Sequence, residues 1–150
     1  MKKKKFVFEF NKYFDKLWPI NRSLTGSGSR KTHKILSEII PLKTHEIKSG
    51  YKVNDWKIPN EWNVKQAYIM NAEGKKIIDF ENNNLHLVGY SKPFSGYISK
   101  KDLKKKLFYL KNKPNAIPYR TSYYKKDWRI CLSFNQYKKI IDNKYYIKID

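Results

Sequence analysis

Cysteine, arginine and acidic residues are scarce in this sequence of 150 residues, and their scarcity excludes several classes of protein. Cys131 is the single cysteine, so the chain can build neither an internal disulfide nor a zinc site made of cysteines. We expect its thiol to be buried as a small hydrophobe, because no histidine partner for a nucleophile can be assigned. A glycine-rich phosphate loop and the Gly-x-Ser-x-Gly motif of serine hydrolases are also missing.

Long apolar runs are absent as well. No run approaches the roughly 20 residues that would span a bilayer. Four lysines follow Met1, as at the start of a signal peptide, but charged and amide side chains interrupt the apolar region that should come next. We therefore expect a cytoplasmic protein that has no membrane partner.

Basic residues outnumber acidic ones by 33 to 13, which gives a formal net charge of +20. A charge of this size attracts nucleic acids. However, only four of the basic residues are arginine, the lysines are scattered, and no nucleic-acid-binding motif accompanies them. We expect a weak, salt-sensitive attraction to polyanions and no specific nucleic-acid partner.

Two helices are predicted at the start of the chain. Large apolar side chains recur every three or four residues from Phe6 to Leu17, which predicts one helix that Pro19 ends. Ser27 or Ser29 is expected to cap a second helix, which ends before the next proline.

The corner between these helices contains Arg22, Ser23 and Thr25. Two interpretations are open. The corner is either a capped connection between helices, or a site where free N–H groups and Arg22 face an anionic or carbonyl group.

Strand patterns dominate the rest of the chain, so the fold class is α+β. The predicted strands are 43–48, 53–58, 64–70, 77–80, 85–90 and 144–149. Of these, 64–70 and 77–80 form the best hairpin candidate. Ser99 is expected to cap a short helix, and 134–141 is a final helix candidate.

Histidines and carboxylates form no recognisable catalytic or metal-binding pattern. His33, His45 and His86 are not spaced as zinc ligands, and the acidic residues look like ordinary charges at strand ends. We assign no catalytic residue and no metal ligand in this chain.

The segment from Tyr119 to Tyr124 is the second candidate binding site. Arg120 offers a planar fork for a carboxylate or phosphate, and Thr121, Ser122 and Tyr123 add hydroxyls and an aromatic face. This composition suits a peptide terminus or a sugar. The alternative is a tyrosine-rich loop that Arg120 ties to backbone carbonyls.

Several ordered segments resemble a bacterial family of aminopeptidase-like proteins, described largely as domains of unknown function. These segments are 17–26, 55–63, 84–86, 116–124 and 128–133. Members are similar to zinc-dependent exopeptidases, with an α/β sandwich that carries an inserted β-rich module. Some occur with polysaccharide-biosynthesis genes, and many have a C-terminal winged-helix domain.

The resemblance implies three parts in this chain. Residues 1–48 would hold the two helices and first strand of the peptidase-like domain, 49–128 the inserted β-rich module, and 129–150 the return to a truncated sandwich. Strands 43–48 and 144–149 would then lack sheet neighbours. In the family the zinc ligands follow the strand that begins near residue 144, so none can be transferred to this chain.

We therefore expect the N-terminal fragment of a zinc-aminopeptidase-like protein that is catalytically incomplete alone. Its partner would be the missing C-terminal part of the peptidase-like domain, if that is separately encoded. The main alternative is a stand-alone module that binds a glycan or peptide. A nonspecific basic nucleic-acid binder comes third.

Overall fold

The computed structural model describes residues 2–150, and it describes side chains from Glu9 onward. The chain forms two compact units: an N-terminal unit that ends at Asn63 and a C-terminal unit, Val64–Asp150. The predicted domain boundaries, 48/49 and 128/129, do not coincide with this division. None of the described helices has the length and hydrophobicity that crossing a bilayer requires.

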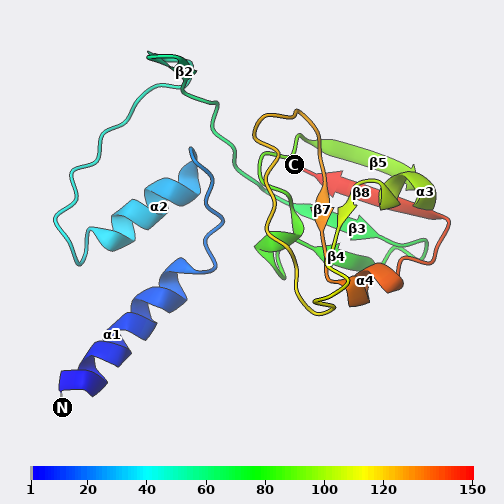
Figure 1. Ribbon diagram of the computed structural model, residues 1–150, viewed down its shortest axis with the longest axis horizontal. Coiled ribbons are helices and arrows are strands. Elements are labelled where there is room, and N and C mark those ends of the chain that lie inside the picture. Colours follow the sequence, from blue (N-terminus) through cyan, green and yellow to red (C-terminus); the bar gives the residue numbers. More distant parts are fainter. Residues whose placement is uncertain (1) are drawn as a thin grey trace. The chain divides into compact units, whose positions relative to one another are not determined.

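The N-terminal unit contains two helices and one small hairpin (Figure 1). Helix α1 spans Lys2–Leu17, as predicted. Helix α2 spans Ser27–Leu36, so it exists as predicted but ends before Ile39 and Ile40, which were expected on its apolar face. The side chain of Phe6, which belongs to the predicted apolar face of α1, lies outside the described side chains. Strands β1 (Lys52–Val53) and β2 (Trp56–Lys57) pair antiparallel.

The predicted strand at 43–48 is wrong. This segment is neither helix nor strand, and its residues are exposed. A strand needs neighbours for its N–H and C=O groups, and the sheet of this unit consists of β1 and β2. The predicted strand 53–58 is confirmed only in part, because residues 54 and 55 form the turn between β1 and β2 and the residues of both short strands are exposed.

The cap of α2 also differs from the prediction. Gly26 occupies the N-cap position and has no side chain to offer, while Ser27 lies within the helix. Instead, the Asn63 side-chain oxygen accepts hydrogen bonds from the Ser27 N–H (2.8 Å) and hydroxyl (2.7 Å). The cap therefore comes from a residue that is distant in the sequence.

The C-terminal unit is built on a four-stranded antiparallel sheet in the order β4-β3-β8-β5 (Figure 1). Its strands are β3 (Ala67–Met70), β4 (Lys76–Asp79), β5 (Phe94–Ser99) and β8 (Lys144–Ile149). The hairpin of β3 and β4 is confirmed.

Strand β8 occupies an interior position in this sheet, which corrects the expectation that 144–149 lacks neighbours. It pairs with β3 on one side and β5 on the other. Tyr145, Ile147 and Ile149 alternate along it and are buried. Residues 129–150 therefore complete the β-rich unit.

Short elements cover the rest of this unit. They are the 3₁₀ helix η1 (Asn84–His86), α3 (Lys100–Lys104), β6 (Leu107–Phe108), β7 (Ile130–Cys131) and α4 (Phe134–Lys138). Strands β6 and β7 are parallel. Ser99 caps α3 as predicted, and Ser133 caps α4 through a capping box.

The predicted strand at 85–90 is wrong, because its first residues lie in η1. The Asn83 side chain accepts a hydrogen bond from the Leu85 N–H, which favours a helical turn there. Two isolated bridges, from Leu87 to Ile130 and from Gly89 to Thr121, are what remains of the strand pattern.

Candidate functional site

The corner between α1 and α2 is held by hydrogen bonds to backbone carbonyls. Arg22 Nη1 donates to the carbonyl of Leu17 at 2.8 Å. The Ser23 hydroxyl donates to the carbonyls of Thr25 and of Trp62, the latter at 3.0 Å. The corner thus has the geometry of a structured connection, in which Arg22 faces a carbonyl of its own chain.

The corner also binds the segment 60–63. The Thr25 hydroxyl donates to the Asn60 carbonyl at 3.0 Å, and the Trp62 N–H donates to the Thr25 carbonyl at 3.3 Å. Together with the Asn63 cap on Ser27, these bonds join two segments more than 30 residues apart. Both segments belong to those on which the family resemblance rests.

Two glycines of the corner allow backbone segments to lie unusually close together. A Cβ at Gly26 would lie 2.8 Å from the Trp62 carbonyl oxygen, and the Gly26 φ of 143° is unfavourable for other residues. A Cβ at Gly28 would lie 2.0 Å from the Asn21 carbonyl oxygen. The glycines of the corner are therefore explained by packing of the backbone.

Arg30 is a residue of this region that our sequence analysis did not assign. Its Nε donates to Glu46 Oε1 at 2.9 Å, and its two Nη groups donate to the carboxylate of Glu61. The hydrogen bond with Arg30 holds the pKa of Glu61 below its usual range. Arg30, Glu46 and Glu61 line a polar pocket of about 510 Å³ beside Thr44–Ser49. No spacing rule links these three residues, so only the fold could identify them.

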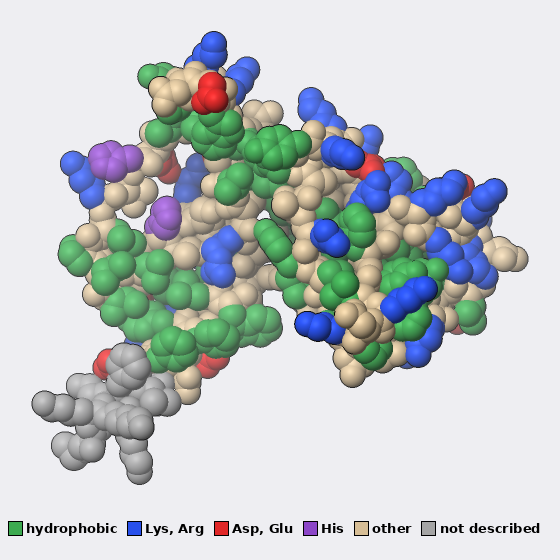
Figure 2. All heavy atoms as spheres, viewed as in Figure 1, with side chains coloured by type: hydrophobic (Ala, Val, Ile, Leu, Met, Phe, Trp, Pro, Cys, Tyr) green, Lys and Arg blue, Asp and Glu red, His purple; other side chains and the backbone are tan. Residues whose placement is uncertain are grey.

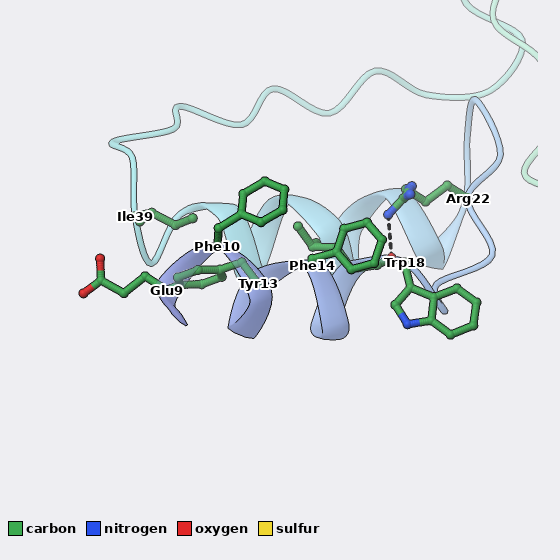
Figure 3. A pocket seen from close by; sticks show the side chains of 8 residues that line it. Glu9, Phe10, Tyr13, Phe14, Trp18, Arg22 and Ile39 are labelled. Carbon is green, nitrogen blue, oxygen red and sulfur yellow. Dashed lines mark hydrogen bonds between the residues drawn. The ribbon is translucent and has the colours of Figure 1, made fainter. Parts of the chain in front are cut away.

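An apolar pocket of about 400 Å³ lies along α1 (Figure 3). Its lining residues are Glu9, Phe10, Tyr13, Phe14, Leu17, Trp18, Arg22 and Ile39. Phe10 and Phe14 stack with ring centroids 6.1 Å apart. Arg22 is the one predicted site residue in this lining.

The second candidate site, in the C-terminal unit, is a loop attached to Gly89. The Gly89 N–H donates to the Arg120 carbonyl at 3.0 Å, and the Ser122 N–H donates to the Gly89 carbonyl at 2.8 Å. The Ser122 hydroxyl donates to the same carbonyl at 3.2 Å, and the Thr121 hydroxyl at 3.5 Å. Thr121 and Ser122 therefore serve the backbone connection.

Aromatic contacts organise the exposed side of this loop. Tyr123 meets Tyr90 edge to face at 5.0 Å between ring centroids. The Arg120 guanidinium lies 5.3 Å from the centroid of the Phe108 ring. Tyr119 and Tyr124 are 75% and 91% exposed. Arg120 and Tyr123 thus belong to one loop of the C-terminal unit, whereas the corner residues Arg22, Ser23 and Thr25 belong to the N-terminal unit.

Buried polar groups of the C-terminal unit have structural partners. His86 Nδ1 lies 2.8 Å from the Cys131 carbonyl oxygen. Burial lowers the pKa of His86, although that hydrogen bond and Asp79 oppose the shift. Burial raises the pKa of the Cys131 thiol to about 11. The thiol is therefore protonated at neutral pH, which agrees with its predicted role in packing.

A metal centre is not evident in the part of the chain that the structure describes. Within residues 2–150, no three His, Cys, Asp or Glu side chains come close enough to hold a metal ion. The residues present thus do not fit the zinc site that the family resemblance implies for complete members.

Comparisons with known proteins find similarity over nearly the whole chain. The chain is 44% identical over 142 residues to a Clostridium acetobutylicum protein named for polysaccharide biosynthesis and an aminopeptidase-like domain. That match covers 95% of this chain and 33% of the relative. A crystal structure from the same organism, named as that of a peptidase, superposes with a TM-score of 0.93 at 43% identity.

The superposition covers 97% of this chain and 35% of that crystal structure. The chain thus spans about a third of the length of the relatives that it matches. A family model described as a domain of unknown function matches residues 61–150, which include the whole C-terminal unit. The chain therefore belongs to the DUF2172 family.

Proposed function

We propose that this chain is one part of an aminopeptidase-like protein and holds no catalytic centre by itself. The observation that carries the proposal is the match with the Clostridium protein, which covers 95% of this chain but 33% of the relative. We call the unmatched part of that relative, about two thirds of its length, the complementary part. In this proposal the complementary part supplies the catalytic residues.

Zinc, if the complete protein uses it, would be bound by the complementary part. A zinc exopeptidase needs several protein ligands around one metal ion that activates water. His33 and His45 are exposed in the N-terminal unit, while His86 is buried in the C-terminal unit and bonded to Cys131. His86 thus has a structural contact, and the described residues place no group of three possible metal ligands around His33 or His45.

A chimera tests the proposal. The 150 residues replace the matching segment of the Clostridium relative, and the chain alone and the unmodified relative are studied in parallel. Zinc is measured after washing with a chelator, and hydrolysis is measured on a panel of aminoacyl p-nitroanilides. We expect about one zinc per chain and hydrolysis in the chimera and the relative, and neither in the chain alone.

Two results would contradict the proposal. One is stoichiometric zinc or hydrolysis in the isolated 150-residue chain. The other is a folded chimera that lacks zinc and activity while the relative has both.

A second candidate function is recognition of a peptide or glycan by the loop around Arg120. It is favoured by the exposure of Tyr119 and Tyr124, which precede and follow Arg120 in the same loop, since aromatic faces and a planar cation suit such ligands. NMR titration of the chain with short peptides and acidic sugars tests it. Binding should be lost in Arg120→Ala and kept in the neighbouring control Lys125→Ala.

Nucleic-acid binding is the third candidate, and it rests on the net charge of +20. We expect any such binding to be independent of base sequence and to weaken steeply with salt. Affinity that depends on the sequence at roughly physiological salt would favour a dedicated function in nucleic-acid recognition.

A further inference from the structure

An exposed apolar face runs along α1 and the turn after α2. Phe10, Phe14, Trp18 and Ile39 are each more than half exposed and line the 400 Å³ pocket together with Tyr13 and Leu17. These six residues are called the α1 face below. Figure 2 shows hydrophobic side chains gathered on the surface of the unit that contains α1 and α2.

Helix α1 is amphipathic, like a helix whose apolar side packs against another part of a protein. Its apolar side chains recur every three or four residues, whereas Lys12 lies about 160° around the helix from Phe14. Such a stripe normally lies against a hydrophobic core. Among the described side chains of residues 9–63, however, no apolar one is buried.

From this we infer that the α1 face is the docking surface for the complementary part of the protein, an inference that rests on the proposed function. The solved relative supplies the argument. Its match leaves out only 3% of the 150 residues, about five, so it must include most of α1 and α2. That protein has the same backbone and nearly three times the polypeptide, which is available to cover the face.

Other occupants fit the face less well. A second copy of this chain would bring together two molecules that each carry a net charge of +20, which disfavours their association. An anionic membrane would attract the lysines of α1, but the pocket also contains the carboxylate of Glu9. A folded polypeptide with an apolar surface suits the pocket best.

Thiol accessibility tests the inference. Phe14→Cys places a thiol in the α1 face, and Lys12→Cys is a matched control on the opposite side of the same helix. Cys131 is fully buried and serves as an unreactive internal reference. Both variants are made in the isolated chain and in the chimera, and the rate of reaction with a maleimide is measured.

We expect the thiol at position 14 to react at least about tenfold more slowly in the chimera than in the isolated chain. The thiol at position 12 should react at similar rates in both. Equal rates at position 14 in the two proteins would overturn the inference. Protection in the isolated chain that grows with concentration, with a dimer seen by light scattering, would assign the face to a second copy and also overturn it.

Vesicles of phosphatidylcholine and phosphatidylserine test whether the α1 face binds a membrane instead. Protection of position 14 by vesicles, with none in the chimera, would overturn the inference. The result is also separable from the proposed function. If the chimera protects the thiol at position 14 but shows no hydrolysis, the docking surface stands and the peptidase assignment is rejected. If the chimera hydrolyses the substrates but leaves this thiol unprotected, the peptidase assignment stands and the docking surface is rejected.

Discussion

The two units of this chain differ most in what their apolar side chains contact. In the C-terminal unit they form a core that includes Ile69, Leu103, Ile130 and Ile147. In the N-terminal unit, none of the described apolar side chains is buried. Both units have well-formed secondary structure, so the comparison separates the formation of an element from its stabilisation by packing.

The N-terminal unit is held together by polar contacts and not by a hydrophobic core. Hydrogen bonds around Ser23, Thr25 and Asn63 set the corner, and Arg30 joins Glu46 and Glu61. Exposed ion pairs of this kind contribute little, typically about 0–1 kcal/mol. An isolated helix as short as α2, which has 10 residues, is marginal in water. The difference in burial therefore predicts a difference in stability.

Hydrogen exchange should show the largest contrast. In the isolated chain, we expect amides of β3 and β8 to exchange at least about a thousandfold more slowly than those of α1 and α2. Slow exchange in β8 follows from its pairing with strands on both sides. Equal, strong protection of both units in a monomer would mean that the N-terminal unit is stable without further polypeptide.

A core substitution sharpens the comparison. Ile147→Ala removes a fully buried side chain from the middle of β8 and should destabilise the C-terminal unit by about 2–5 kcal/mol. The matched control Ile39→Ala removes a side chain that is 53% exposed and should leave that transition within about 0.5 kcal/mol. Urea unfolding followed by NMR of sheet amides measures both. A small effect at Ile147 would contradict the assignment of β8 to the core.

Helix caps give a smaller contrast between the units. Ser133→Ala removes both the cap on α4 and the capping box with Gln136, and should cost about 1 kcal/mol of unfolding free energy. Ser27→Ala in the N-terminal unit should leave the unfolding of the sheet unchanged, since its partner Asn63 lies in the same unit. Urea midpoints of the two variants test this. If Ser27→Ala lowered the unfolding free energy as much as Ser133→Ala, the two units would have to unfold together.

Acid should weaken the C-terminal unit through His86. Burial lowers the pKa of His86 in the folded chain, so the unfolded chain takes up a proton first as the pH falls. The contribution of neutral His86 is therefore complete above about pH 6.5, and it declines as the pH falls from there toward the folded pKa. In His86→Gln this part of the pH dependence of the urea midpoint should disappear. An unchanged pH profile would show that another group titrates.

Local patterns were sufficient for part of the fold. The periodicity up to Leu17 predicted α1, the strand patterns 64–70 and 77–80 predicted the hairpin of β3 and β4, and Ser99 predicted the cap of α3. The binding role of Arg22, Ser23, Thr25, Arg120, Thr121, Ser122 and Tyr123 stays a prediction. The structure adds that five of these side chains donate hydrogen bonds to backbone carbonyls, namely those of Arg22, Ser23, Thr25, Thr121 and Ser122.

Other features required contacts that no local pattern encodes. The segment 43–48 has strand-like composition but no strand to pair with, whereas 144–149 has two. The cap of α2 comes from Asn63, and Arg30 meets two acidic residues from separate segments.

By itself the sequence determined helix α1, the hairpin of β3 and β4 and the cap of α3, because turns, caps and apolar periodicity act over a few residues. It also determined that Cys131 is a packing residue and, through its ordered motifs, which family the chain resembles. Tertiary structure alone decided that β8 completes the C-terminal core and that the α1 face stays exposed. The physical reason is that burial depends on which distant segments meet, and an apolar stripe has the same pattern whether or not this chain covers it.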